Sequence, residues 1–158
     1  METNTAKELL ALLKARSETL AGAESLTGGL VADTLVGVPG ASAVFKEAFV
    51  TYCDEAKHRT LGVPAEILKE YGAISKECAG KMAVGAAVKA ESDMSYATTG
   101  NAGPSAAEGK PVGFVCIAVC YRKKTVIEEL HLSGDRASIR KQSAEAVLRL
   151  CLKTAGEI

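Results

Sequence analysis

A turn between residues 23 and 29 constrains the fold of this chain most. An apolar run stops there, two hydroxyl side chains and two glycines follow in Ala23-Glu24-Ser25-Leu26-Thr27-Gly28-Gly29, and a helical pattern begins. Paired glycines let a backbone turn tightly and let its N–H groups approach a bound group. The first turn of a helix leaves its N–H groups unpaired and partly positive. We therefore expect a strand-to-helix turn that presents Ser25 beside a site for negative charge, although such turns are also common as purely structural helix caps.

Helical and strand patterns alternate through the first hundred residues, and a hairpin follows. This order predicts an α/β fold, a three-layer α/β/α sandwich with a mixed sheet. The first helix is expected to start at a capping box of Thr5 and Glu8, and later helices are expected to be capped by Asp54 and Ser75. Helices are predicted at 5–13, 30–37, 64–72, 76–91 and 135–154, with a further helix that begins at residue 55, and strands are predicted at 18–23, 45–53, 96–99, 113–121 and 125–132.

Composition narrows the class of protein. The 158 residues fit a single domain spanning 1–158, since 47% are hydrophobic and 24% are charged. The formal net charge is zero, so neither nucleic acid nor membrane is an expected partner. The amino-terminal residues alternate charged and apolar types without a signal-length apolar stretch, which predicts a soluble cytoplasmic protein.

The sequence favours no cofactor and no metal. The five cysteines are an odd number without a CxxC pair, and the two histidines, His58 and His131, are far apart. Reduced, buried thiols are the simplest interpretation.

Ser25 needs a base to become a nucleophile, because a free serine hydroxyl is inert near neutral pH. Neither histidine is obviously placed to help, but Lys57 falls in the first turn of a predicted helix. The helix dipole and desolvation would both favour a neutral lysine, which is a competent base. Serine–lysine pairs are a known variant of the serine–histidine arrangement, and Tyr52 could relay or orient the proton. The alternative is that Lys57 is a solvated surface residue and Tyr52 an ordinary core residue.

Two further segments could bind an anion. Arg136 and Arg140 lie four residues apart at the start of the last helix and share a face, where a phosphate or carboxylate would offset their unfavourable interaction with the helix dipole. The alternative is that Asp135 caps the helix and pairs with one arginine. The loop from Thr99 to Pro104 could offer backbone N–H groups to an anion through Gly100, Asn101, Ala102 and Gly103, or be a plain turn. It matches neither a Walker loop nor a dinucleotide fingerprint.

Together these segments resemble the CinA C-terminal family, the nicotinamide mononucleotide deamidases. Glu24-Ser25-Leu26-Thr27-Gly28-Gly29 is similar to the ESxTGG signature of that family, and later blocks follow in order over nearly the whole chain. These blocks are Val38-Pro39-Gly40-Ala41-Ser42, Phe49-Val50-Thr51-Tyr52 with Glu55-Ala56-Lys57, Gly72-Ala73-Ile74-Ser75, Gly100-Asn101-Ala102-Gly103-Pro104, Lys110-Pro111-Val112-Gly113 and Gly134-Asp135-Arg136.

The resemblance implies hydrolysis of the carboxamide of nicotinamide mononucleotide, a small-molecule substrate, to nicotinate mononucleotide and ammonia in pyridine nucleotide salvage. It places Ser25 and Lys57 in the catalytic positions, with Tyr52 in the matching tyrosine position. It places Arg136 at the substrate phosphate, and Arg140 is a further candidate there. It further implies a homo-oligomer and the standalone form of the family.

Backbone N–H groups of Thr27, Gly28 and Gly29 are the candidates for an oxyanion hole. The chain departs from the family pattern at Leu26, where cysteine is common, and at Asn101, where an apolar residue is usual. The altered loop leaves open a non-catalytic module that binds a phosphorylated nucleotide or a protein in the same pocket. An amidase for another small amide is a third hypothesis.

Overall fold

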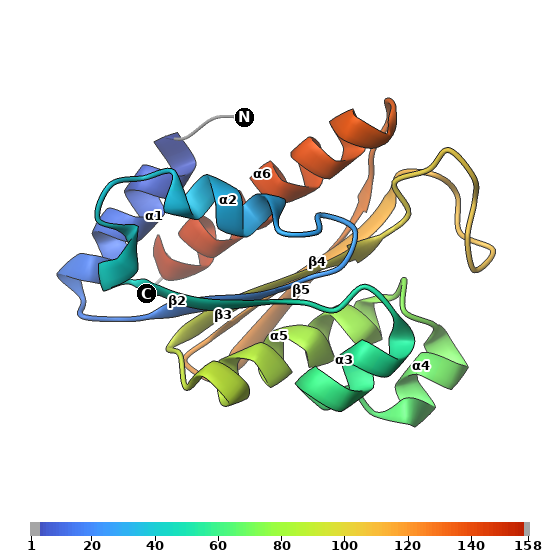
Figure 1. Cartoon of the computed structure of the whole chain (residues 1–158), viewed down its shortest axis with the longest axis horizontal. Coiled ribbons are helices and arrows are strands. Elements are labelled where there is room, and N and C mark those ends of the chain that lie inside the picture. The colour runs from blue at the N-terminus through green and yellow to red at the C-terminus, as the bar shows by residue number, and fades with distance from the viewer. Residues whose placement is uncertain (1–3, 157–158) are drawn as a thin grey trace.

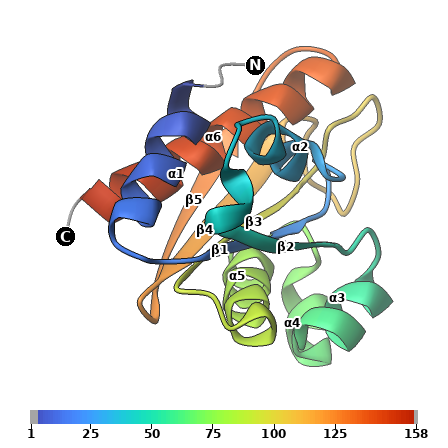
Figure 2. The same ribbon diagram turned by 60° about the vertical axis from the view of Figure 1, so that its left-hand side comes forward.

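The computed structural model describes residues 4–156 and has an α/β fold. A five-stranded mixed sheet lies between two layers of helices, as predicted, with α1, α2 and α6 on one face and α3, α4 and α5 on the other (Figure 1). The turned view shows α3 and α4 beside α5, on the side of the sheet away from α1 and α6 (Figure 2).

The sheet has the strand order β2-β1-β3-β4-β5. The second strand in this order, β1, runs parallel to both of its neighbours, β2 and β3, whereas β4 is antiparallel to both β3 and β5. The predicted hairpin is confirmed as the β4–β5 pair. The strands are β1 (Leu20–Glu24), β2 (Phe45–Val50), β3 (Met94–Gly100), β4 (Phe114–Tyr121) and β5 (Lys124–His131).

The helices follow the predicted order with small differences at their ends. They are α1 (Asn4–Ala15), α2 (Leu30–Val36), α3 (Asp54–Leu61), α4 (Ala65–Tyr71), α5 (Lys76–Ala90) and α6 (Arg136–Gly156), with a 3-10 turn, η1, at Ala41–Ala43. The predicted Ser75 cap is confirmed, because its hydroxyl accepts a hydrogen bond from the Cys78 N–H at 3.1 Å.

Two predicted caps are wrong. Thr5 lies inside α1, where its hydroxyl donates to Glu145 of α6 at 2.9 Å instead of capping its own helix. Asp54 is the first residue of α3, and the N-cap is Cys53 in an extended conformation. The predicted second strand is also too long, because β2 ends at Val50 and leaves the next three residues to lead into α3.

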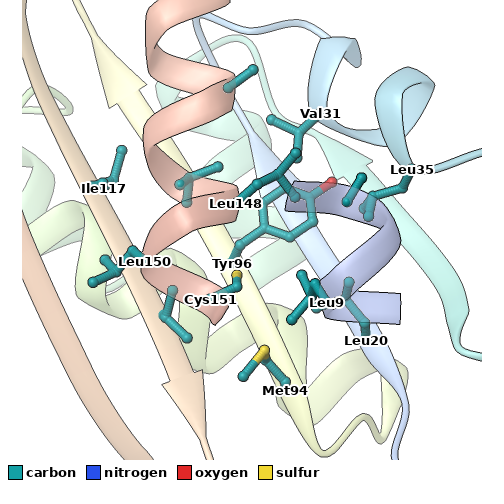
Figure 3. Close-up of a cluster of buried hydrophobic side chains, with 14 of the residues drawn as sticks. Leu9, Leu20, Val31, Leu35, Met94, Tyr96, Ile117, Leu148, Leu150 and Cys151 are labelled. Atoms are coloured by element: carbon teal, nitrogen blue, oxygen red, sulfur yellow. The ribbon is translucent and has the colours of Figure 1, made fainter. Parts of the chain in front are cut away.

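Each face of the sheet has its own apolar core. Beneath α1, α2 and α6, large aliphatic side chains surround the ring of Tyr96 (Figure 3). Beneath α5 the core is made of smaller side chains, because Ala79, Ala83 and Ala86 let the helix approach the sheet closely. The apolar stripe of α6 is buried against the first of these cores, at Ala144, Val147, Leu148 and Cys151.

The carboxyl ends of β1 and β3 lie side by side, with Glu24 paired to Thr98. Because these strands are parallel neighbours, the serine turn after β1 and the loop after β3 meet at one edge of the sheet. In α/β sheets, ligands bind outside the carboxyl ends of parallel strands. Within residues 4–156, no helix is long and apolar enough to cross a membrane.

Substitution of Gly22 by alanine should destabilise the protein severely. Gly22 faces Tyr96 across the β1–β3 pair, and a Cβ at Gly22 would lie 1.9 Å from the tyrosine ring. We expect Gly22→Ala to lower the free energy of unfolding by about 1–3 kcal/mol, the usual cost of overpacking. Urea denaturation followed by circular dichroism measures this. Gly156→Ala is the matched control, because a Cβ at Gly156 would meet nothing within 4 Å apart from its chain neighbours and the backbone of its own helix. An equal effect of the two variants would contradict the packing argument.

Candidate functional site

A cavity of about 250 Å³ lies where the turn after β1, the start of α3 and the loop after β3 meet. Polar side chains from distant parts of the chain converge in it, which is typical of a small-molecule site. A larger cavity of about 360 Å³ lies along α5, but its walls are mainly apolar. The smaller cavity is lined by Ser25, Leu26, Tyr52, Asp54, Lys57, Ala73, Ile74, Thr99, Gly100, Asn101, Ala102, Glu108 and Arg136.

Ser25 is the first residue after β1 and is half-buried. Its N–H donates to the Thr98 carbonyl at 3.0 Å, so the backbone of the serine is fixed by the neighbouring strand. The side chain is consequently held at the carboxyl edge of the sheet, and its hydroxyl faces the cavity.

The carboxylate of Glu24 shapes the turn that follows. Glu24 is fully buried, and within residues 4–156 no Lys, Arg or His side chain forms a hydrogen bond or a salt bridge with it. One oxygen, Oε1, accepts hydrogen bonds from the Thr27 hydroxyl at 2.7 Å and from the N–H groups of Gly29 and Val31. The other, Oε2, accepts from the Ala32 N–H at 2.9 Å and from the Tyr96 hydroxyl at 2.8 Å. The carboxylate therefore satisfies the free N–H groups at the start of α2.

Sequence reasoning did not assign this role to Glu24. The available signal was a charged residue at the end of an otherwise apolar strand, because a buried charge is costly unless several donors bind it. Thr27, predicted to bind substrate, is also fully buried, and its hydroxyl bonds Glu24 and Thr98 instead of facing the cavity.

Lys57 extends from the first half of α3 to Ser25. Its Nζ lies 2.9 Å from the Ser25 Oγ and 2.6 Å from the Thr51 carbonyl oxygen. The side chain is only 1% exposed. Burial lowers the pKa of Lys57 below its ordinary value, because removal from water penalises the charged ammonium; the Cys78 thiol, Asp54, Cys53 and Glu108 oppose this shift.

This geometry suits a serine–lysine pair. A neutral amine has two hydrogens and one lone pair, so it can donate to the Thr51 carbonyl while its lone pair accepts the proton of Ser25. The Thr51 carbonyl thereby orients the amine toward the serine. The arrangement can activate a hydroxyl without a histidine.

Arg136 bridges the rim of the cavity. One guanidinium nitrogen donates to the Tyr52 hydroxyl at 2.9 Å, and another donates to the Gly103 carbonyl of the loop after β3. Both Tyr52 and Arg136 are exposed and line the cavity. A cation is therefore present where an anionic group of a ligand would enter.

Arg140 does not line the cavity. Its guanidinium donates to the carbonyls of Leu26 and Thr27 at 2.9 and 2.8 Å and so holds the serine turn from behind. The Gly28 and Gly29 N–H groups are also engaged, with the Ser25 carbonyl and with Glu24. Two of the three backbone donors proposed from the sequence for an oxyanion hole thus serve the turn itself.

Asn101 organises the loop after β3. Its side chain accepts from the Gly103 N–H at 3.1 Å and donates to the Lys110 carbonyl at 3.2 Å. Its backbone bonds Phe114 and Gly113, so this residue closes the base of the loop. Gly100, Asn101 and Ala102 line the cavity, while Gly103 reaches it only through its bond to Arg136.

The remaining polar lining was not predicted. Asp54 and Glu108 both contribute carboxylates, and no feature of the sequence links residue 108 to the serine turn. Within residues 4–156, no group of three or more His, Cys, Asp or Glu side chains could hold a metal ion.

Comparison with known proteins gives a consistent result. Residues 2–155 match the family described as the CinA C-terminal domain. A CinA-like protein of Dictyoglomus turgidum is 46% identical over 140 residues, which cover 88% of this chain and 34% of that protein. A putative competence-damage inducible protein of Clostridium beijerinckii is 44% identical over 143 residues, covering 90% of this chain and 35% of the relative. The chain thus spans about a third of the length of these relatives.

Solved structures agree with this comparison. The crystal structure of a CinA superfamily protein from Klebsiella pneumoniae has a TM-score of 0.96 and 29% identity, and covers 100% of both chains. The competence/damage inducible protein CihA from Agrobacterium tumefaciens has a TM-score of 0.93 and 33% identity, and covers 98% of this chain and 94% of that one.

Replacement of the Glu24 carboxylate should disturb the serine turn. In Glu24→Gln, the amide NH₂ would face donors that now require an acceptor, so buried N–H or O–H groups would lose their partner. We expect the free energy of unfolding to fall by about 1–3 kcal/mol, measured by urea denaturation. Glu47→Gln, an exposed position on β2, is the matched control. Equal stability of the two variants would contradict a structural role for the Glu24 charge.

Proposed function

Because this chain belongs to the CinA C-terminal domain family, we propose that it hydrolyses the carboxamide of nicotinamide mononucleotide to nicotinate mononucleotide and ammonia. The observation that carries the proposal is the 2.9 Å contact between the Lys57 Nζ and the Ser25 Oγ inside a cavity. The buried amine and the hydroxyl are close enough for direct proton transfer.

The proposed reaction has two halves. Lys57 takes the proton of Ser25 while Oγ attacks the amide carbon, and the resulting ammonium of Lys57 then protonates the departing nitrogen, which leaves as ammonia. An acyl ester on Ser25 remains. Lys57, neutral again, removes a proton from water, the hydroxide attacks the ester, and the proton returns to Ser25 as the carboxylate product forms.

Arg136 is proposed to bind the phosphate of the substrate. It is an exposed cation at the cavity rim, and its bonds to Tyr52 and the Gly103 carbonyl hold the guanidinium in one place. A fixed phosphate would position the carboxamide for attack. In this proposal Tyr52 acts chiefly through Arg136, because its hydroxyl accepts a hydrogen bond from that side chain.

The cellular setting is part of the proposal. All five cysteines are free thiols and four of them are buried, which fits the reducing cytoplasm. The resemblance to the family also leads us to propose a homo-oligomer.

The direct test is ammonia release from nicotinamide mononucleotide by the purified chain. We expect turnover in the presence of a chelator, and a loss of at least about 10³-fold in kcat for Ser25→Ala and for Lys57→Ala, since each removes a member of one catalytic unit. Glu66→Gln, an exposed change on α4, should retain full activity. Unchanged turnover in either catalytic variant would contradict the mechanism.

Ammonia release together with a binding measurement separates the alternatives. Tight binding of the mononucleotide by calorimetry without ammonia release would favour the non-catalytic module. Equal turnover of phosphorylated and unphosphorylated nicotinamide compounds would favour an amidase for other amides, because Arg136 would then have no phosphate to bind.

The pH dependence of kcat/KM should report the deprotonation of Lys57. The reaction requires the neutral amine, so we expect the rate to rise with pH and to level off above the pKa of Lys57, which burial places below 10.5. Lys57→Arg should be inactive at every pH because its guanidinium does not deprotonate. A wild-type rate that falls as pH rises over this range would contradict Lys57 as the base.

A further inference from the structure

The tip of the loop between β3 and β4 is attached across the cavity by a single carboxylate. Glu108 Oε1 accepts from the Ile74 N–H at 3.0 Å, and Oε2 accepts from the Ala73 N–H at 3.3 Å. The peptide of Ala73 is held from its other side, where its carbonyl accepts from the Thr99 hydroxyl at 2.7 Å. The two N–H groups are thus presented to the loop by a fixed segment.

Both sides of this contact are built for it. Gly72 has a φ of +82°, and a Cβ there would lie 2.3 Å from Glu108 Oε1, so the carboxylate occupies space that only glycine leaves open. Glu108 itself has a φ of +55°, in a tight turn closed by the Lys110 N–H to the Ala107 carbonyl at 2.9 Å. A glutamate rarely adopts this backbone conformation, and the two hydrogen bonds offset its cost.

Glu108 also determines the charge of the cavity. Asp54, Lys57, Glu108 and Arg136 are the Asp, Glu, Lys and Arg side chains of its lining. In the proposed reaction Lys57 is neutral and Arg136 is neutralised by phosphate, so the two carboxylates leave the cavity negative. The carboxamide of the proposed substrate is attached to a positively charged pyridinium ring, which a negative cavity attracts.

We propose that Glu108 is a specificity-determining residue: docked on Gly72, Ala73 and Ile74, it holds the loop as a wall of the cavity and gives the site its preference for an amide on a cationic ring over a neutral ring of the same shape. This inference rests on the proposed function. It adds a preference for a cationic ring among amides that carry the same phosphate.

The test compares two ligands that differ in ring charge. Nicotinamide mononucleotide and its 1,4-dihydro form share the phosphate, ribose and carboxamide, but the dihydro ring is neutral. Binding is measured by calorimetry at low ionic strength with Ser25→Ala, so that no turnover occurs. We expect the cationic form to bind about fivefold more tightly. The added change Glu108→Gln should lower this ratio to about twofold, because Asp54 is then the one carboxylate left in the lining, and the matched change Glu66→Gln should leave it unaltered.

The outcomes separate the inference from the proposed function. A binding ratio that Glu108→Gln does not change, or equal binding of both forms to the Ser25→Ala protein, overturns the inference while ammonia release by the wild type still supports the deamidase. Absence of binding by either form, together with absence of ammonia release, overturns both.

A second measurement addresses the wall itself. Glu108→Ala should speed proteinase K cleavage within residues 105–109 several-fold without changing the melting temperature by more than Glu66→Gln does. An unchanged cleavage rate would show that Glu108 does not hold the loop.

Discussion

The conformation of the serine turn, residues 24–29, depends on the buried carboxylate of Glu24. Glu24 is the last residue of β1, and its carboxylate binds donors from the serine turn, from the start of α2 and from Tyr96 on the neighbouring strand β3. A carboxylate removed from water costs several kcal/mol unless donors replace its hydration. The observed conformation of the turn supplies those donors together, so the charge favours that conformation and, with it, the direction in which Ser25 points.

Lys57 shows the complementary use of burial. The same desolvation that lowers its pKa favours the neutral amine, which is the form that the proposed mechanism requires. The acidic groups nearby pull the other way, and Glu108 and Asp54 do so while also lining the cavity. In the proposed function, the Lys57 amine must be neutral, whereas a cationic ligand is attracted by the same carboxylates that favour the charged ammonium. Burial has a larger effect on the pKa of Lys57 than these carboxylates have, so the neutral amine is compatible with their presence.

The sequence was sufficient for most of the fold because its signals are local. Alternating helical and strand patterns and the Ser75 cap depend on spacing within a few residues, and the structure confirms them. Local reasoning failed at Thr5, whose hydroxyl bonds a residue 140 positions away. It also failed at Asp54, which is the first residue of α3 and not its cap. The strand before α3 ends at Val50, although the β-branched and aromatic residues that follow favour a longer strand.

The residues of the site also differ in whether the sequence predicts them. The sequence placed Ser25, Lys57 and Arg136 in one group, and the cavity brings these side chains together. Sequence reasoning could not separate Arg136 from Arg140, which share a helix face: one reaches the rim, whereas the other is drawn to the carbonyls of the serine turn. The roles of Glu24 and Glu108 depend on which backbone N–H groups remain unpaired once the chain has folded. That property belongs to tertiary structure, and no spacing in the sequence encodes it.

Asn101 fixes the loop after β3 without touching Ser25 or Lys57. An apolar residue at this position could only pack, whereas the asparagine side chain bonds Gly103 and Lys110 and so ties together the two ends of the loop. The loop is then fixed at its base by Asn101, two residues further on by Arg136 through the Gly103 carbonyl, and at its tip by Glu108. None of these contacts involves Ser25 or Lys57. Change in the loop can therefore alter the cavity wall while leaving the hydrogen bond between Ser25 and Lys57 in place, and Glu108 is the residue of the loop whose charge also acts on the pKa of Lys57.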